Sequence, residues 1–314
     1  MIKFKYRYSN SVFEYSFNNL LNSNVMNVIL FPTDFSNCAN EAQKVAFSLA
    51  KLFNAELKII HVVSDTIFKW ESEDHFHESI SMFPIHSNTT KVIIEDNEPN
   101  NLANSLKKIK KEAHDLGIKS TTELLFGDTS RVILEQISKH KASLLVMGTN
   151  GASGIKEAFI GSITQWITKK AECPVLSIRR LPKKGFKVEK IVYASDFKVE
   201  SENKNLELIK ILASYFNAQI HLLFINTPHY FEESYSCLNR IIDVAKKHDL
   251  ENYKVDIYNH YTVEDGVINY SEKNDVDIIA VSNHQYGIFK SLIEHRTTEA
   301  LINHAKVPVL TLNI

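Results

Sequence analysis

The sequence predicts two α/β domains in tandem, each a doubly wound, mainly parallel five-stranded sheet with helices on both faces. Apolar runs typical of buried strands alternate with amphipathic runs typical of helices. The alternation begins again after a short polar linker that contains both proline and glycine. A length of 314 residues suits two domains of ~150 residues each.

The first strand is expected at residues 28–32, an all-apolar run that ends at Pro32. Ser36 is a natural N-cap for the next helix, whose apolar residues recur along one face from 39 to 52. A second strand is expected at residues 56–63. A strand, a helix and a strand at this spacing form a βαβ unit, which implies a parallel sheet.

In the rest of the first half, expected strands continue to alternate with expected helices. Strands are expected at 121–126, 144–147 and 175–178, and helices at 99–116, 130–140 and 163–171. Residues 1–26 have no sustained period and are expected to be an N-terminal extension. Residues 64–97 form a long connection, and we expect a flap beside a ligand site. The three histidines in this connection, His75, His77 and His86, fit no metal-ligand spacing.

The second half repeats the first. Ile191–Phe197 resembles Ile29–Phe35, and Val309–Leu312 matches Val175–Ile178 after a shared proline. The chain is therefore a duplication. The expected boundaries are 27–180 for the first domain, 181–187 for the linker and 188–314 for the second domain.

Four of the nine glycines lie between the strand expected at 144–147 and the helix expected at 163–171. They are Gly148, Gly151, Gly154 and Gly161. Glycine allows a backbone to approach a ligand closely, and the N-terminus of a helix attracts anions. A loop of this kind at this place is typical of phosphate binding.

The first half resembles the nucleotide-binding branch of the universal stress protein family. That family has a G-x2-G-x9-G-[ST] loop, which Gly148, Gly151, Gly161 and Ser162 match. Its P-x-D tripeptide is present as Pro32–Asp34, and its His-Val pair as His61 and Val62. The resemblance covers residues 27–180 with every motif and 188–314 with degraded motifs. It implies a Rossmann-like fold, similar to the adenine nucleotide alpha hydrolases.

The resemblance also implies a binding mode for ATP, with or without Mg²⁺. Asp34 would accept hydrogen bonds from the adenosine, the backbone of Val62 would contact adenine, and glycine N–H groups would hold ribose and phosphate. Asp34 and Ser162 each have another interpretation, as the N-cap of the helix that follows. The expected site comprises Pro32, Thr33, Asp34, Val62, Met147, Gly148, Gly151, Gly161, Ser162 and Ile163.

The second domain lacks the glycines. Matching Pro174 with Pro308 places Ser282 at Gly148, Gln285 at Gly151 and His295 at Gly161, with Tyr261 opposite Gly127. Side chains at these positions would fill the volume that phosphates need. We therefore expect this domain not to bind ATP in the same way, although Asp196 stands at the position of Asp34.

The composition excludes several functions. A net charge of −1 gives no broad attraction to nucleic acid or anionic lipid, and no run approaches the ~18 apolar residues of a membrane span. Three cysteines, distant from one another, suit a reducing cytoplasm and form no zinc motif. No Walker loop, nucleophile elbow or metal-binding helix is present, so we expect no fast enzyme, although slow ATP hydrolysis stays open.

Three functions remain in competition. The first is a cytoplasmic stress-response regulator that binds ATP or another adenine nucleotide and acts on an unknown protein partner. The second is an interaction scaffold that does not need the nucleotide, and the third is a slow ATP-hydrolysing enzyme. Because family members commonly pair through their last strands, Val175–Ile178 and Val309–Leu312 could pair within one chain as a pseudo-dimer. A further homodimer stays open.

Overall fold

The computed structural model describes residues 26–64, 98–149, 161–181, 185–198, 202–283 and 295–313. Residues 1–25 of the expected N-terminal extension, residues 65–97 of the expected flap, Gly151 and Gln285 lie outside this part of the chain. The described strands are β1 Val28–Pro32, β2 Glu56–Val63, β3 Ser120–Phe126, β4 Leu144–Gly148, β5 Val175–Ile178, β6 Lys190–Ala194, β7 Gln219–Asn226, β8 Tyr253–Asn259, β9 Ile278–Asn283 and β10 Val309–Asn313. The described helices are α2 Asn37–Phe53, α3 Glu98–Asp115, α4 Thr129–His140, α5 Ser162–Lys170, α6 Glu202–Phe216, α7 Ser234–Lys247, α8 Val263–Lys273 and α9 His295–His304.

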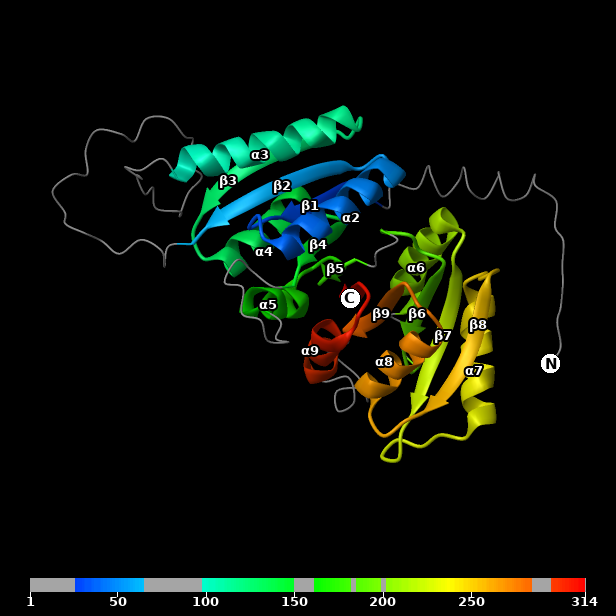
Figure 1. Ribbon diagram of the computed structural model, residues 1–314. Helices are drawn as coiled ribbons and strands as arrows, with labels where there is room; N and C mark the ends of the chain where they lie inside the picture. Colours follow the sequence, from blue (N-terminus) through cyan, green and yellow to red (C-terminus); the bar gives the residue numbers. More distant parts are fainter. Residues whose placement is uncertain are drawn as a thin grey trace, which may run out of the picture.

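The strands form one ten-stranded sheet in the order β3-β2-β1-β4-β5-β10-β9-β6-β7-β8 (Figure 1). Each half is parallel and doubly wound, as the sequence predicts, and its strand order reverses once, between β1 and β4 or between β6 and β9. The two halves meet where β5 pairs antiparallel with β10. The expected pairing of the last strands within one chain is therefore present, and it covers an edge of each five-stranded half.

The central strands are buried on both faces because their side chains are apolar throughout. Along β1, Ile29 and Phe31 pack into the core shared with α2 and α3, while Leu30 packs into the core shared with α4 and α5. The first of these cores is continuous with the second domain. The rings of Phe53 and Tyr215, from α2 and α6, meet edge to face with centroids 4.6 Å apart. The halves are thus joined by packing as well as by the sheet.

Single residues explain where two of the helices begin or end. The hydroxyl of Ser36 accepts a hydrogen bond from the Ala39 N–H at 3.2 Å, which confirms it as the N-cap of α2. Gly117, with φ of 75°, adopts the left-handed conformation that ends α3. None of the helices in the described ranges is long and apolar enough to cross a membrane.

Candidate functional site

The expected site lies at the carboxyl ends of the strands of the first domain, around the reversal between β1 and β4. Ligands of open α/β sheets bind in this kind of crevice. Thr33 and Asp34 follow β1, Val62 stands near the end of β2, Met147 and Gly148 end β4, and Gly161 leads into Ser162 and Ile163 at the start of α5. The fold thus brings these residues to one edge of the sheet. Gly151 lies outside the described residues.

The turn after β1 has its own hydrogen bonds. The Phe35 N–H donates to the hydroxyl of Thr33 at 3.1 Å, and the Ser36 N–H donates to Oδ1 of Asp34 at 3.0 Å. Phe35 has φ of 60°, so the chain bends sharply here. Because Ser36 is the N-cap of α2, the interpretation of Asp34 as that cap is wrong. Asp34 instead shapes the turn with one carboxylate oxygen, and its side chain stays half-buried.

His61 anchors this turn to β2. Its Nδ1 lies 2.6 Å from the carbonyl oxygen of Thr33, which can only accept, so Nδ1 carries the proton and donates. Its ring lies against Phe35 with centroids 4.8 Å apart. Burial lowers the pKa of His61, although the Thr33 carbonyl and the charge of Asp34 act in the opposite direction. His61 is therefore neutral and holds the turn after β1 in place. The sequence alone marks it only as part of the His-Val pair.

Gly148 is required by packing. A Cβ added at this position would lie 2.9 Å from both the amide nitrogen of Ala39 and the carbonyl carbon of Cys38. These are backbone atoms of α2, which cannot rotate away. The carboxyl end of β4 therefore approaches the start of α2 more closely than any other residue type would allow.

The two ends of the glycine loop are fastened to each other. The Gly161 N–H donates to the carbonyl of Thr149 at 2.9 Å. The hydroxyl of Thr164 lies 3.2 Å from the carbonyl of Gly148 and 3.3 Å from that of Thr149. The start of α5 is consequently held against the end of β4.

Among the residues that the structure describes, no side chain caps the N-terminus of α5. Gly161 is the N-cap residue, so the interpretation of Ser162 as the cap of its own helix is wrong. The first turn also carries no acidic residue. By contrast, side chains of Ser36, Asp128 and Thr262 cap α2, α4 and α8. Within the described residues, the partial positive charge at the start of α5 is thus neither capped nor neutralised, which favours an anion there. α7 likewise has no side-chain cap bond and no acid in its first turn, but it follows Glu233.

The corresponding crevice of the second domain is filled. Ser282 pairs with Leu312 as Gly148 pairs with Ile178, so it stands where Gly148 stands. Ser282 is only 1% exposed, and its hydroxyl accepts a hydrogen bond from the amide of Asn205 at 3.0 Å. α9 begins at His295, whereas Gly161, to which the constant offset matches it, is the N-cap before α5.

The expected match of Tyr261 with Gly127 is wrong by one residue. The Gly127 N–H donates to the last carbonyl of β2, and the His260 N–H donates to the last carbonyl of β7, each at 3.0 Å. His260 is therefore the counterpart of Gly127. Tyr261 is an additional residue before the cap of α8, which is why a match by constant offset misplaces it.

Charged side chains lie across the second crevice. Asp196 is only 2% exposed, and its carbonyl accepts a hydrogen bond from Nε of Arg240 at 3.0 Å. Glu232 forms ion pairs with Lys198 and, at 2.9 Å, with Arg240. Burial acts to raise the pKa of Glu232, but the hydrogen bonds from Lys198 and Arg240 outweigh it and hold this pKa below its ordinary value. Asp196, the counterpart of Asp34 in this domain, is thus covered.

The model of the universal stress protein family matches the chain twice, over residues 26–179 and 187–313. A universal stress protein of Methanocaldococcus jannaschii is 36% identical over 161 residues, which are 51% of this chain and 86% of that protein. A universal stress protein of Bacillus subtilis is 27% identical over 162 residues, which are 49% of this chain and 100% of that protein.

A solved structure extends the likeness to nearly the whole chain. The crystal structure of a universal stress protein from Archaeoglobus fulgidus has a TM-score of 0.70 and covers 92% of this chain and 97% of its own, at 18% identity. At this identity the likeness shows the fold alone, and it includes both halves. The chain belongs to the universal stress protein family and carries two copies of the family's domain in tandem.

Proposed function

We propose that the first domain binds ATP or another adenine nucleotide, and that the second domain does not bind it in this way. The observation that carries the proposal is the N-terminus of α5, which no described side chain caps and which is held beside Gly148 at the reversal of strand order. A helix N-terminus with free N–H groups and no acid in its first turn favours a phosphate. In the second domain, Ser282 occupies the position of Gly148.

The residues around the first-domain crevice are of types that would bind the phosphates and the adenosine of the nucleotide. The backbone around Gly148 and Gly161 would face phosphates, and the exposed hydroxyl of Ser162 would add a donor. Asp34, whose Oδ1 already accepts from the Ser36 N–H, would use its other oxygen toward the adenosine. Gly151 belongs to the same proposed set by its place in the sequence, as do Pro32, Thr33, Val62, Met147 and Ile163. A bound Mg²⁺ would neutralise phosphate charge.

The proposed role is regulation in the cytoplasm rather than fast catalysis. Binding would order the glycine loop and alter a surface that a partner protein contacts. Fast hydrolysis needs a placed base and a cation at the transferred phosphate. The residues of the proposed site include no lysine or arginine that could supply that cation.

The test is the release of nucleotide from purified protein after denaturation, measured by mass spectrometry, together with a thermal shift on adding ATP. A ligand that binds only the folded state raises the melting temperature according to its concentration and dissociation constant. We expect both signals, and their loss when Gly151 and Gly161 are both changed to valine. The absence of bound nucleotide and of any shift would overturn the proposal.

The scaffold function is the second candidate, because one crevice of the pair is filled by its own side chains. It predicts that the double valine variant still rescues the phenotype of a deletion strain. A slow enzyme is the third candidate. It predicts turnover by pure protein that is lost in Asp34→Ala.

A further inference from the structure

A buried polar cluster joins α8 to the sheet of the second domain. It comprises His221 on β7, Asp256 on β8 and Tyr270 on α8. His221 and Tyr270 are each only 3% exposed, although α8 otherwise packs through an apolar core. Buried polar side chains need their hydrogen bonds to be satisfied, so the bonds of this cluster bear on how firmly α8 is held.

The hydrogen bonds of the cluster run in one direction. The hydroxyl of Tyr270 donates to Oδ2 of Asp256, because a carboxylate can only accept. Nδ1 of His221 lies 2.8 Å from the same hydroxyl oxygen, which therefore accepts. Burial and the bond to Asp256 hold the pKa of Tyr270 above its ordinary value, so the hydroxyl keeps its proton. Nδ1 of His221 consequently carries a proton whether the ring is neutral or charged.

The other ring nitrogen of His221 can carry a proton or lack one. Nε2 lies 3.1 Å from Oε1 of Gln219, an arrangement that suits a protonated Nε2. When the amide of Gln219 is turned over, its NH₂ group donates to an unprotonated Nε2 instead. His221 is therefore hydrogen-bonded in both protonation states, and the difference between them is a buried charge.

The one negative charge of the cluster is already paired. Nζ of Lys254 lies 2.9 Å from Oδ2 of Asp256 and 5.9 Å from the centre of the Tyr270 ring. Lys254 thus balances Asp256 before His221 gains a proton, and a charged ring would add a second cation beside it.

Further charged groups are contributed by β6, by α8 and by the residue before β9, namely Lys190, Lys273 and Asp277. Burial lowers the pKa of His221. The charges of Lys254 and Lys190 also lower this pKa, whereas the charge of Asp256 raises it. The neutral ring is therefore favoured while α8 is in place.

The first domain has a permanent charge at the corresponding position. Lys58 pairs with Leu30 of β1 as His221 pairs with Val192 of β6. The ammonium of Lys58 lies 2.7 Å from the carboxylate of Glu56. A lysine stays charged throughout the range in which a histidine titrates, so only the second domain has a group at this position that responds to mild acid.

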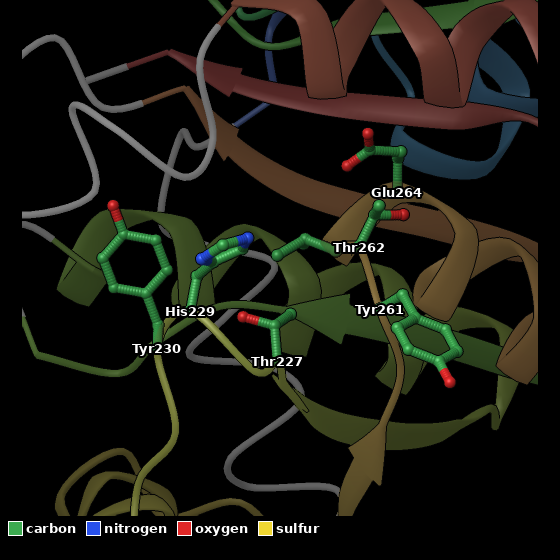
Figure 2. A pocket seen from close by; sticks show the side chains of 7 residues that line it. Thr227, His229, Tyr230, Tyr261, Thr262 and Glu264 are labelled. Atoms are coloured by element: carbon green, nitrogen blue, oxygen red, sulfur yellow. The ribbon is translucent and has the colours of Figure 1, made fainter.

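α8 also forms one wall of a pocket of ≈ 460 Å³. Thr262, the N-cap of α8, and Glu264 in its first turn line the pocket from this side, and Thr227 and Tyr230 line it from the segment after β7 (Figure 2). Tyr270 lies farther along the same helix. Movement of α8 away from the sheet therefore changes the shape of this pocket.

We propose that His221, Tyr270 and Asp256 form a pH-sensitive latch, which holds α8 on the sheet while His221 is neutral and releases it when acid protonates the ring. A proton on Nε2 places an imidazolium near the charges of Lys254 and Lys190 in a core that excludes water, which is costly. Release of α8 exposes the ring to water, where the charge is solvated. The latch is independent of the proposed ATP site, because it lies in the other domain.

The direction of the pH dependence follows from proton linkage. The ring binds a proton more readily when α8 is released, because its pKa then returns toward the ordinary value of about 6.5. The released state is therefore favoured as the pH falls below this value. For one proton, the equilibrium constant for release rises by at most about tenfold per pH unit.

The experiment is hydrogen exchange of the full chain, measured by mass spectrometry at pH 7, 6 and 5 and corrected for the exchange rate of unstructured peptides at each pH. We expect the opening of α8 to increase with acid by up to about tenfold per pH unit. α6, which packs on the opposite face of the same strands, is the internal control and should keep its protection. Unchanged protection of α8, or equal losses in α6 and α8, would overturn the proposal.

His221→Gln tests the latch directly. Glutamine keeps a donor for the Tyr270 hydroxyl but gains no proton, so α8 should open no more at pH 5 than at pH 7. His140→Gln is the matched control, because His140 lies on α4 of the first domain and also contacts a glutamine side chain, at 3.0 Å. It should leave the acid-induced opening of α8 as in the unchanged protein. An α8 that still opens with acid in His221→Gln would refute the role of His221.

Asp256→Asn gives a second test, with a result that a merely structural role does not predict. Asparagine still accepts from the Tyr270 hydroxyl, but the negative charge that favours protonation of His221 is lost. α8 should therefore open at a lower pH than in the unchanged protein, and the NMR signal of the His221 ring should titrate at a lower pH as well. Either an unchanged pH of opening or a ring that titrates at or above the ordinary histidine pKa in the unchanged protein would contradict the latch.

Discussion

The turns after β1 and β6 have the same hydrogen bonds but different surroundings. In both, an aspartate Oδ1 accepts from the N–H two residues later at 3.0 Å, and the preceding hydroxyl accepts from another N–H at 3.1 Å. Asp34 is nevertheless half-buried, whereas Asp196 is almost fully covered. An aspartate at this position therefore stabilises the turn in both domains. Whether it can also contact a ligand depends on how far the surrounding side chains cover it.

The space beside the end of the fourth strand also differs between the two domains. In the first domain, Gly148 lies against the backbone of α2, and no described side chain caps the start of α5. In the second domain, Ser282 bonds Asn205 across the equivalent space. The two domains therefore share the same strand ends, but the residues at those ends differ.

The largest effect is expected from Gly148→Val. Its Cβ would meet the backbone of Cys38 and Ala39 at 2.9 Å, so the free energy of unfolding should fall by about 1–3 kcal/mol, and bound nucleotide should be lost. Urea unfolding monitors the first effect and nucleotide release the second. Gly161→Ala is the control, because its Cβ would lie 3.3 Å from the Thr149 carbonyl at an ordinary φ of −60°. An equal loss of stability in the two variants would contradict the packing argument.

A smaller loss is expected from Ser282→Gly. The amide of Asn205 loses its buried partner, which should lower the free energy of unfolding by about 1–2 kcal/mol. The second domain should gain no ATP binding, because Lys198, Glu232 and Arg240 still cover Asp196. The measurement is a thermal shift with ATP in the background of the double valine variant. A positive shift there would show that one side chain alone closes the crevice.

The pH dependence of stability should reflect His61. Its pKa in the folded state is lowered by burial, so the unfolded chain binds the proton more readily. Stability should therefore be full above the ordinary histidine pKa of about 6.5 and decrease as the pH falls below it. His61→Asn, which keeps a donor, should show a shallower decrease in urea midpoints between pH 7 and pH 5. His140 and His221 share the lowered pKa and remain in both proteins, so the difference reports His61.

The smallest effect is expected at the junction of the domains. Lys169 on α5 and Glu299 on α9 form an ion pair of 2.6 Å, and both side chains are partly buried. A double-mutant cycle with alanine should give a coupling of about 0.3–1 kcal/mol that decreases with salt. The more exposed pair of Lys306 and Glu272 is the control and should couple less. A coupling near zero for Lys169 and Glu299 would mean that the strand pairing and the apolar core hold the junction without them.

Much of the fold could be predicted because its signals are local. The apolar run of β1, the Ser36 cap and the repeated proline before the last strand each depend on adjacent residues. The candidate site was partly predictable for the same reason, since its glycines and the Pro32–Asp34 turn follow strand ends. The role of His61 in holding that turn was not predictable, because it depends on which carbonyl its ring meets.

The sequence by itself determined the two domains, the order of their elements and the presence of one glycine loop where the other copy has side chains. The tertiary structure decided that Asp196 is covered in the second domain. Lys198, Glu232 and Arg240 are distant in sequence and meet only because two loops and α7 pack together. It also decided that Tyr261 is an additional residue before the cap of α8. Local patterns encode strands and helices, whereas contacts between distant side chains exist only once the loops are folded.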